Sequence, residues 1–377
     1  MNHISFIGTE LPKPNEGWDF TDSQPDPLSA IHPYPAKFIS NIPRKLIKDF
    51  PPQKGLALLD PFCGSGTSLS EAQAAGIPSI GVDVNPIAVM ISRVRLSEIP
   101  AGVLSVAEQV ELIARADLEP RLPMIPRLNH WFKPRVQLAI ASLTGAIEEN
   151  SVGGCKELLR LALSSIIVRV SNQDSDTRYA AVDKAVDAED VYRLFGAAVK
   201  RTVKALESRP ARLADVQVIE ADVLTIDRRN IERPIGLVVT SPPYPNAYEY
   251  WLYHKYRMWW LGLDPLAVKE REIGARAHFF KGRKSHTAQD FERQMTSVLG
   301  MLRDVMVTGG HACFVVGRSL IRGETVDNAK IIADAGAATG FCEVMRAERV
   351  IAASRKSFNL SHANIKTETV LVMRKGN

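Results

Sequence analysis

Two short apolar runs, each ending in an aspartate, constrain the fold of this chain more than any other feature. Residues 55–60 (GLALLD) lead into a glycine-containing turn, and residues 77–83 (IPSIGVD) follow a segment of helical character at residues 67–75. A strand, a glycine turn, a helix, a second strand and an acid, in this order, make half of a doubly wound nucleotide-binding unit. The chain is therefore predicted to contain an α/β sheet that is largely parallel.

Later apolar runs supply the rest of the predicted sheet. They are residues 216–222, 235–240, 311–317 and 367–375. Between the second and third strands lies a long stretch in which apolar residues recur at helical spacing, as in Val136, Ile140, Leu143 and Ile147. We therefore expect an N-terminal arm and the first half of the core in residues 1–96, a helical insertion in residues 97–215, and the second half of the core in residues 216–377.

The turn after the first strand, residues 60–67 (DPFCGSGT), predicts a ligand site. Gly64 and Gly66 let the backbone approach a ligand and adopt conformations that are closed to residues with a Cβ atom. A phosphate-binding loop would carry a third glycine at fixed spacing. Here that glycine is missing, and Asp60 places a carboxylate in the turn. A carboxylate suits an ammonium group better than a phosphate.

Two further aspartates end predicted strands and extend this site. Asp83 follows the second strand, where an acid can accept hydrogen bonds from ribose hydroxyls. Asp222 follows the third strand, where it can meet the amino group of an adenine. A lone aspartate at either place would fit a helix cap or a turn. In combination with the glycines, the acids predict a ligand with a nucleoside part and a cationic part.

Residues 240–244 (TSPPY), after the fourth strand, indicate which reaction the site catalyses. Two consecutive prolines fix the backbone and supply no amide donors, so acceptors point into the adjacent pocket. Methylation of an aromatic amine requires acceptors that hold the amino protons and a surface on which the base can stack. A base inside a duplex is out of reach and must be flipped out. A proline pair alone would fit a loop that merely ends a strand, but the glycine motif upstream favours the catalytic interpretation.

These motifs resemble those of the DNA amino-methyltransferases, whose catalytic motif is Asp, Asn or Ser followed by Pro-Pro-Tyr. Residues 60–67 are similar to the first motif of that family, and residues 31–38 (IHPYPAKF) to the segment that closes over the methionine end of the cofactor. The resemblance covers the arm, the core strands and residues 241–262. It implies a Rossmann-like S-adenosylmethionine-dependent methyltransferase sheet, S-adenosyl-L-methionine as cofactor and double-stranded DNA as partner, with a cognate restriction endonuclease as a possible second partner.

The resemblance also implies roles for individual residues. The expected cofactor-binding residues are Tyr34, Ala36, Phe38, Asp60, Phe62, Gly64, Gly66, Thr67, Asp83, Asn85 and Asp222. The expected catalytic residues are Ser241, Pro242, Pro243 and Tyr244. Ser241 and the Pro242 carbonyl would accept the amino protons, and Tyr244 would stack on the flipped base.

The first residue of the catalytic motif bears on which base is methylated. Within the family, serine is more typical of enzymes that produce N4-methylcytosine, and aspartate or asparagine of those that act on adenine. Ser241 thus favours cytosine N4, with adenine N6 as the alternative. Methylation of a cytosine carbon is disfavoured because it requires a cysteine that conventionally follows a proline, and no cysteine here does.

Two other functions stay open from the sequence. Several RNA base methyltransferases share a similar cofactor loop and a Pro-Pro-Tyr motif, although no appended RNA-binding module is recognisable here. A non-catalytic subunit that has kept the fold is the third possibility, against which the intact motifs argue. The sequence predicts neither the recognition sequence nor the oligomeric state.

The placement of charge indicates where DNA is contacted. The formal net charge is +5, and residues 269–286 alone carry an excess of four positive charges. Within a basic segment near residues 264–297, we expect phosphate contacts from Arg276, Lys281, Arg283 and Lys284. A solvated charged loop is the alternative. Aromatic residues crowd just before this segment, and Trp251, Lys255 and Trp259 are spaced as on one helix.

Composition excludes several other classes. The four cysteines are far apart and form no metal-type pair, so neither structural zinc nor a disulfide framework is expected, and no metal is predicted. No apolar run approaches the roughly 20 residues that span a bilayer. The first residues show no secretory signal. We therefore expect a cytoplasmic protein without membrane contact.

Overall fold

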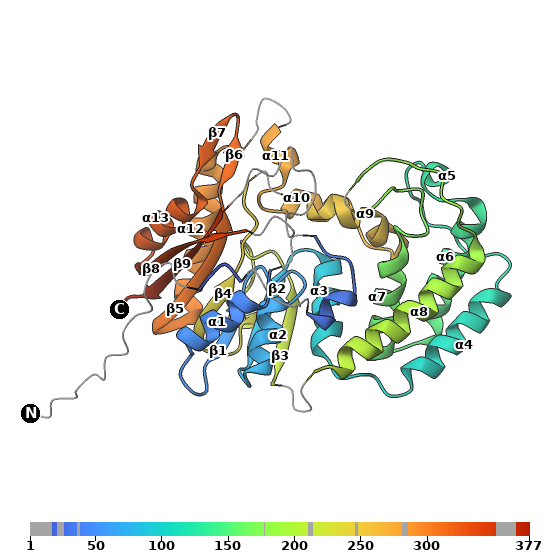
Figure 1. Cartoon of the computed structure of the whole chain (residues 1–377), viewed down its shortest axis with the longest axis horizontal. Coiled ribbons are helices and arrows are strands. Elements are labelled where there is room, and N and C mark those ends of the chain that lie inside the picture. Colours follow the sequence, from blue (N-terminus) through green and yellow to red (C-terminus); the bar gives the residue numbers. More distant parts are fainter. Residues whose placement is uncertain are drawn as a thin grey trace, which may run out of the picture.

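The computed structural model of the 377-residue chain is described for residues 17–20, 26–35, 38–176, 178–209, 214–245, 248–280, 286–351 and 367–377. Its centre is a seven-stranded sheet of order β3-β2-β1-β4-β5-β9-β8 (Figure 1). The strands are β1 (Ala57–Asp60), β2 (Ser79–Asp83), β3 (Val216–Glu220), β4 (Ile235–Thr240), β5 (Met306–Gly317), β8 (Phe341–Val350) and β9 (Thr367–Lys375). Neighbouring strands from β3 to β5 pair parallel, and β9 pairs antiparallel with both β5 and β8. The Rossmann-like α/β fold expected from the sequence is confirmed.

Alternating residues of the central strands face two separate apolar layers. Leu58 of β1 packs with Leu69 of α2 (Thr67–Ala74) on one face, where α1 (Asn41–Asp49) also lies. Its neighbour Leu59 packs on the other face, with α12 (Ala288–Val305) and α13 (Asn328–Ala338). Because both faces are covered, β1 and β4 are buried throughout and are encoded as continuous apolar runs.

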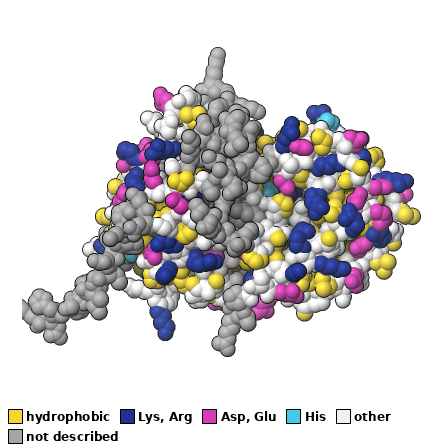
Figure 2. Space-filling model, viewed as in Figure 1, with side chains coloured by type: hydrophobic (Ala, Val, Ile, Leu, Met, Phe, Trp, Pro, Cys, Tyr) yellow, Lys and Arg dark blue, Asp and Glu magenta, His cyan; other side chains and the backbone are white. Residues whose placement is uncertain are grey.

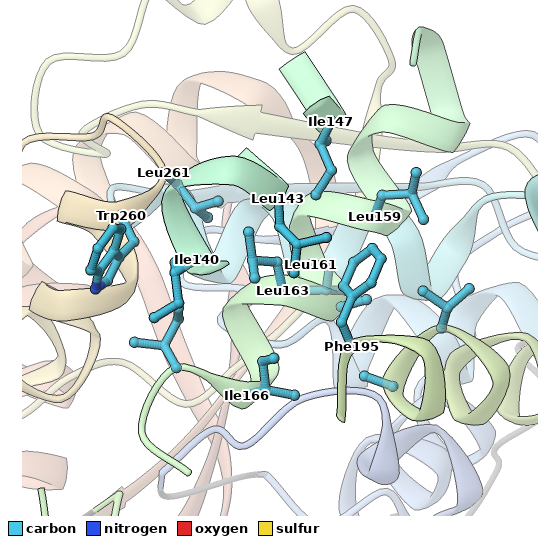
Figure 3. Packing of buried hydrophobic residues seen from close by; sticks show 14 of the residues in the cluster. Ile140, Leu143, Ile147, Leu159, Leu161, Leu163, Ile166, Phe195, Trp260 and Leu261 are labelled. Carbon is cyan, nitrogen blue, oxygen red and sulfur yellow. The ribbon is translucent and has the colours of Figure 1, made fainter. Parts of the chain in front are cut away.

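The predicted insertion is helical. Within residues 97–215 lie α4 (Val103–Ala116), α5 (Leu128–Trp131), α6 (Pro134–Asn150), α7 (Gly153–Ile166) and α8 (Ala188–Glu207). They pack around α9 (Tyr250–Trp260), which comes from the second half of the chain, and we call α4–α9 the helical unit. Figure 3 shows Trp260 of α9 near Ile140 of α6 and Leu261, with Phe195 of α8 on the far side of Leu161 and Leu163 in the same cluster.

The helical unit does not have a separate core. Its apolar cluster continues into α3 (Pro86–Leu96), which follows β2, through Ile87, Met90 and Ile91. Asn85 fixes the start of α3, because its side chain accepts a hydrogen bond from the Ile87 amide. The helical unit is therefore attached to the sheet by a helix that begins at a predicted site residue. No helix among these described residues is long and apolar enough to cross a membrane.

Several elements were not predicted from the sequence. Strand β8 carries charged residues at positions 343, 346, 348 and 349 and is partly exposed, so it lacks the apolar run that marks the inner strands. Strands β6 (Ser319–Ile321) and β7 (Glu324–Val326) form a short separate hairpin. The remaining short helices are η1 (Pro27–Ala30), η2 (Arg228–Asn230), α10 (Pro265–Arg271) and α11 (Arg276–Phe280).

Gly81 tests how closely α2 packs on β2. A Cβ atom at this position would lie 2.5 Å from Leu69 Cδ1 and 2.9 Å from Cys63 Cβ. Gly81→Ala is therefore expected to lower the free energy of unfolding by about 1–3 kcal/mol in urea titrations. Gly145 in α6 is the matched control, because a Cβ there meets nothing within 4 Å and alanine favours the helix. Equal effects of the two substitutions would contradict the packing described here.

Candidate active site

A cavity of about 480 Å³ opens at the carboxyl edge of the parallel strands, a size typical of small-molecule sites. Its wall combines the turn after β1, the ends of β2 and β4, the segment before α1 and the residues that follow α10. The predicted site residues that line it are Tyr34, Phe38, Asp60, Phe62, Gly64, Thr67, Asp83, Asn85, Asp222, Ser241, Pro242, Pro243 and Tyr244. The glycine turn and the TSPPY segment thus face one cavity, as expected of one site.

A direct hydrogen bond joins these two motifs. Thr240 Oγ1 at the end of β4 donates to Asp60 Oδ1 at the end of β1, over 2.6 Å. The same carboxylate accepts the Phe62 amide at 3.1 Å. Burial raises the pKa of Asp60 to about 6, and the hydrogen bonds oppose that rise. At neutral pH most of this carboxyl is therefore ionised, and it faces the cavity.

Asp83 organises the glycine turn from the neighbouring strand. Its Oδ2 accepts the Gly64 amide and its Oδ1 the Asn85 amide, each at 2.8 Å. Each oxygen keeps a second lone pair for a ligand. Burial raises the pKa of Asp83 to about 6 as well. Gly64 adopts φ +51°, which favours glycine, and a Cβ atom there would lie 3.3 Å from the Tyr34 hydroxyl, so a side chain would press on Tyr34.

Gly66 and Ala36, both predicted cofactor residues, are not among the described residues that line the cavity. Gly66 does not line the cavity: it precedes α2 with φ +76°, and a Cβ atom would lie 2.8 Å from Ser92 Oγ. Glycine is needed there to seat the turn against α3, and a direct ligand contact of Gly66 stays a prediction. Ala36 lies outside the described residues.

The geometry of Ser241 makes its oxygen an acceptor. Ser241 Oγ donates its hydrogen to the Val315 carbonyl of β5 at 2.9 Å, which leaves the oxygen lone pairs available. The backbone of Gly274 packs closely against that of Tyr244. Gly274 has φ +75°, and a Cβ atom on it would lie 2.9 Å from the Tyr244 carbonyl oxygen. The residues after α10 thus determine where the TSPPY segment sits.

Sequence reasoning missed Glu272, which lines the same cavity and is 5% exposed. Its two oxygens accept the amides of Tyr250 and Trp251, each at 2.8 Å, and so hold the start of α9 at the cavity. Tyr250 in turn stacks on Tyr34 with ring centroids 5.6 Å apart. Burial raises the pKa of Glu272 to about 8. Because Glu272 lies in the basic stretch predicted to contact DNA, the sequence gave no signal of a buried acid.

The far wall of the cavity was also missed. Arg349 of β8 and Glu368 of β9 face each other in the sheet register and form an ion pair. Arg349 is buried and donates from Nε to the Trp18 carbonyl at 3.0 Å. Glu368 lies in the predicted strand of residues 367–375, but recognition of β8 would have been needed to place Arg349.

The residues predicted to contact DNA are only partly described. Arg276 is exposed at the start of α11, which follows the cavity segment. Lys281, Arg283 and Lys284 lie outside the described residues.

Parts of the chain are similar in sequence to curated proteins. The chain is 27% identical over 239 residues to the Type II methyltransferase M.MvaI of Kocuria varians, which covers 57% of this chain and 53% of M.MvaI. It is 40% identical over 71 residues to the Type II methyltransferase M.MjaII of Methanocaldococcus jannaschii, 19% of this chain and 13% of that protein.

The chain is similar to Type II methyltransferases. This agrees with the family resemblance seen in the motifs, and the chain spans about half the length of the longer-matching curated relatives. No family model matches the chain. Among solved structures, the rRNA methyltransferase aviRa from Streptomyces viridochromogenes aligns over 92% of this chain and 91% of its own, with 11% identity and a TM-score of 0.34.

Glu272→Gln tests the buried carboxyl described above. The folded protein binds this proton more tightly than the unfolded chain does, so Glu272 makes the protein less stable as pH rises from about 5 to about 8. Glutamine mimics the protonated form and removes this dependence. The melting temperature of the wild type minus that of Glu272→Gln is therefore expected to decrease from pH 5 to pH 8. Parallel curves would show that the carboxyl titrates normally.

Proposed function

We propose that this protein is a DNA methyltransferase that transfers a methyl group to the exocyclic amino group of a flipped base, with cytosine N4 as its target. One observation carries the proposal: the Ser241–Tyr244 segment and the Asp60–Thr67 turn face a single cavity and are joined by the Thr240–Asp60 hydrogen bond. The similarity to Type II methyltransferases supports the same conclusion.

The cofactor is S-adenosyl-L-methionine, which supplies a methyl group carried on a positively charged sulfur. The cavity fits a cationic nucleoside ligand, because Asp60, Asp83 and Asp222 all line it at strand ends. Asp60 would hold the ammonium group, Asp83 the ribose hydroxyls and Asp222 the adenine amino group. Tyr34 and Phe38 would close over the methionine end.

Ser241, Pro242 and Tyr244 would act on the base. The amino nitrogen of a base is a poor nucleophile because its lone pair is delocalised into the ring. Ser241 Oγ, whose own hydrogen points to Val315, and the Pro242 carbonyl can accept the amino protons and favour the tetrahedral geometry of methyl transfer. Their benefit is largest in the transition state. Tyr244 would stack on the flipped base.

The choice of cytosine N4 rests on Ser241 in the first position of the motif, and adenine N6 and RNA bases are the competing targets. The partners we propose are double-stranded DNA and, by analogy with Type II relatives, a cognate restriction endonuclease. All four cysteines are free, which agrees with action in a reducing cytoplasm.

Methyl transfer from labelled S-adenosyl-L-methionine tests the proposed function. The protein is expected to label duplex DNA and not RNA, and mass spectrometry of digested DNA is expected to show N4-methylcytosine. Ser241→Ala is the matched variant, with turnover lowered on the order of 10²-fold and nearly unchanged cofactor affinity. Detection of N6-methyladenine would show that the target is adenine and not cytosine. Labelled RNA without labelled DNA would overturn the proposal.

Asp60→Asn tests the cofactor site. Asparagine keeps an oxygen for Thr240 and Phe62 but removes the charge, so the affinity for S-adenosyl-L-methionine is expected to fall by roughly 1.5–3 kcal/mol in calorimetry. In the wild type, protonation of Asp60 and Asp83 as pH falls through about 6 should weaken binding. That pH dependence should be smaller in Asp60→Asn. Unchanged affinity in a folded variant would remove Asp60 from the site.

A further inference from the structure

Helix α9 connects the cavity to the helical unit. Tyr250, its first residue, lines the cavity, and Glu272 holds the Tyr250 and Trp251 amides. Further along, Tyr256, Met258 and Trp260 are buried in the core of the helical unit. In Figure 1, α9 runs from beside α10 towards α5 and α7. Its position relative to the cavity is therefore fixed at both ends.

On the outer side of α9, the Lys255 side chain lies over three aromatic rings. Lys255 Nζ lies 4.1 Å from the ring centre of Tyr179, 5.1 Å from that of Tyr256 and 5.8 Å from that of Trp259. No ion pair to Lys255 occurs among the described residues. Partial burial of the side chain lowers its pKa to about 8. A half-buried cation without a carboxylate partner leaves room for an anionic ligand.

Two further cations lie near aromatic residues of α9. One turn towards the cavity, Trp251 is partly buried, and Lys269 Nζ lies 5.4 Å from its ring centre. On the other side, the exposed Arg127 is close enough to influence the pKa of Tyr256. Aromatic rings interleaved with cations are typical of surfaces that bind nucleic acids.

Elsewhere on the helical unit, many cations are neutralised by acids. On α4 and α8, Arg115 pairs with Glu111 and Glu189, and Arg193 pairs with Asp190. Figure 2 shows acidic and basic side chains intermixed over this side of the molecule. The outer side of α9 differs, because Lys255 contacts aromatic rings and, among the described residues, no carboxylate.

We propose that the outer side of α9, together with Tyr179, binds the sugar-phosphate backbone of the DNA strand next to the flipped base, with Lys255 contacting a phosphate. This inference rests on the proposed function and assigns DNA contact to the helical unit. Lys255 lies five residues after Tyr250, roughly 7.5 Å along the helix axis. That rise matches about two nucleotide steps of 3.4 Å along one strand. The surface therefore meets the strand close to the target base.

Lysine footprinting on the unaltered protein tests this directly. The wild type is treated with an amine-acetylating reagent with and without duplex DNA, and labelling of each lysine is measured by mass spectrometry. DNA is expected to reduce labelling of Lys255 several-fold. Lys54 is the internal control, because it is exposed just before β1, at the opposite edge of the sheet, and its labelling should not change. Equal labelling of Lys255 with and without bound DNA would overturn the inference.

Substitutions give a second measurement. Lys255→Met keeps the aliphatic stem on the rings but removes the charge, so duplex affinity should fall about 5- to 10-fold. The slope of log affinity against log salt should flatten by about 0.9. Lys255→Arg should retain both values, as should Lys54→Met. An unchanged salt slope in Lys255→Met would count against the phosphate contact. If the wild type neither binds nor methylates DNA, the proposed function fails; if it does both and Lys255 is unprotected, only this inference fails.

Discussion

The hydrogen bond from Thr240 to Asp60 is the contact on which the site depends. Because β1 and β4 are parallel neighbours, their carboxyl ends reach the same edge of the sheet, and the loops that follow them must share one space. The 2.6 Å contact fixes the relative position of these loops. In the proposed function, one loop would present acids to the cationic cofactor, and the other would present acceptors to the amino group of the base. A shift of β4 along β1 would move the TSPPY segment away from the glycine turn.

Three buried carboxyls give the cavity its electrostatic character. Asp60, Asp83 and Glu272 accept hydrogen bonds from backbone amides, and none of them forms an ion pair with a described lysine or arginine. Backbone amides satisfy the oxygens without cancelling the charge, so burial raises the pKa of each carboxyl. The unliganded cavity is therefore less stable than one that holds a cation, and a positively charged ligand gains binding free energy on entering it.

The sequence predicted the inner sheet and the two motifs because these are locally encoded. Buried parallel strands are continuous apolar runs, and glycine and proline turns have their own residue requirements. It did not predict β8, whose charged residues interrupt any apolar run, and it therefore missed Arg349. Glu272 was missed for a different reason: only the tertiary fold brings the start of α9 to this carboxylate. The contact of Gly66 with Ser92, which also requires glycine, could not be predicted because it depends on how α3 packs on the turn.

The shared core of the helical unit has a consequence for engineering. A chimaera that replaced only residues 97–215 with the equivalent segment of a relative would leave Tyr256, Met258 and Trp260 facing foreign helices. Half of the interface would then be mismatched, although every exchanged residue came from a natural protein. Transplantation of this unit therefore needs two crossover segments, one for α4–α8 and one for α9, exchanged as a matched set. Any natural recombination between such proteins is subject to the same requirement, so the two segments are expected to be inherited together.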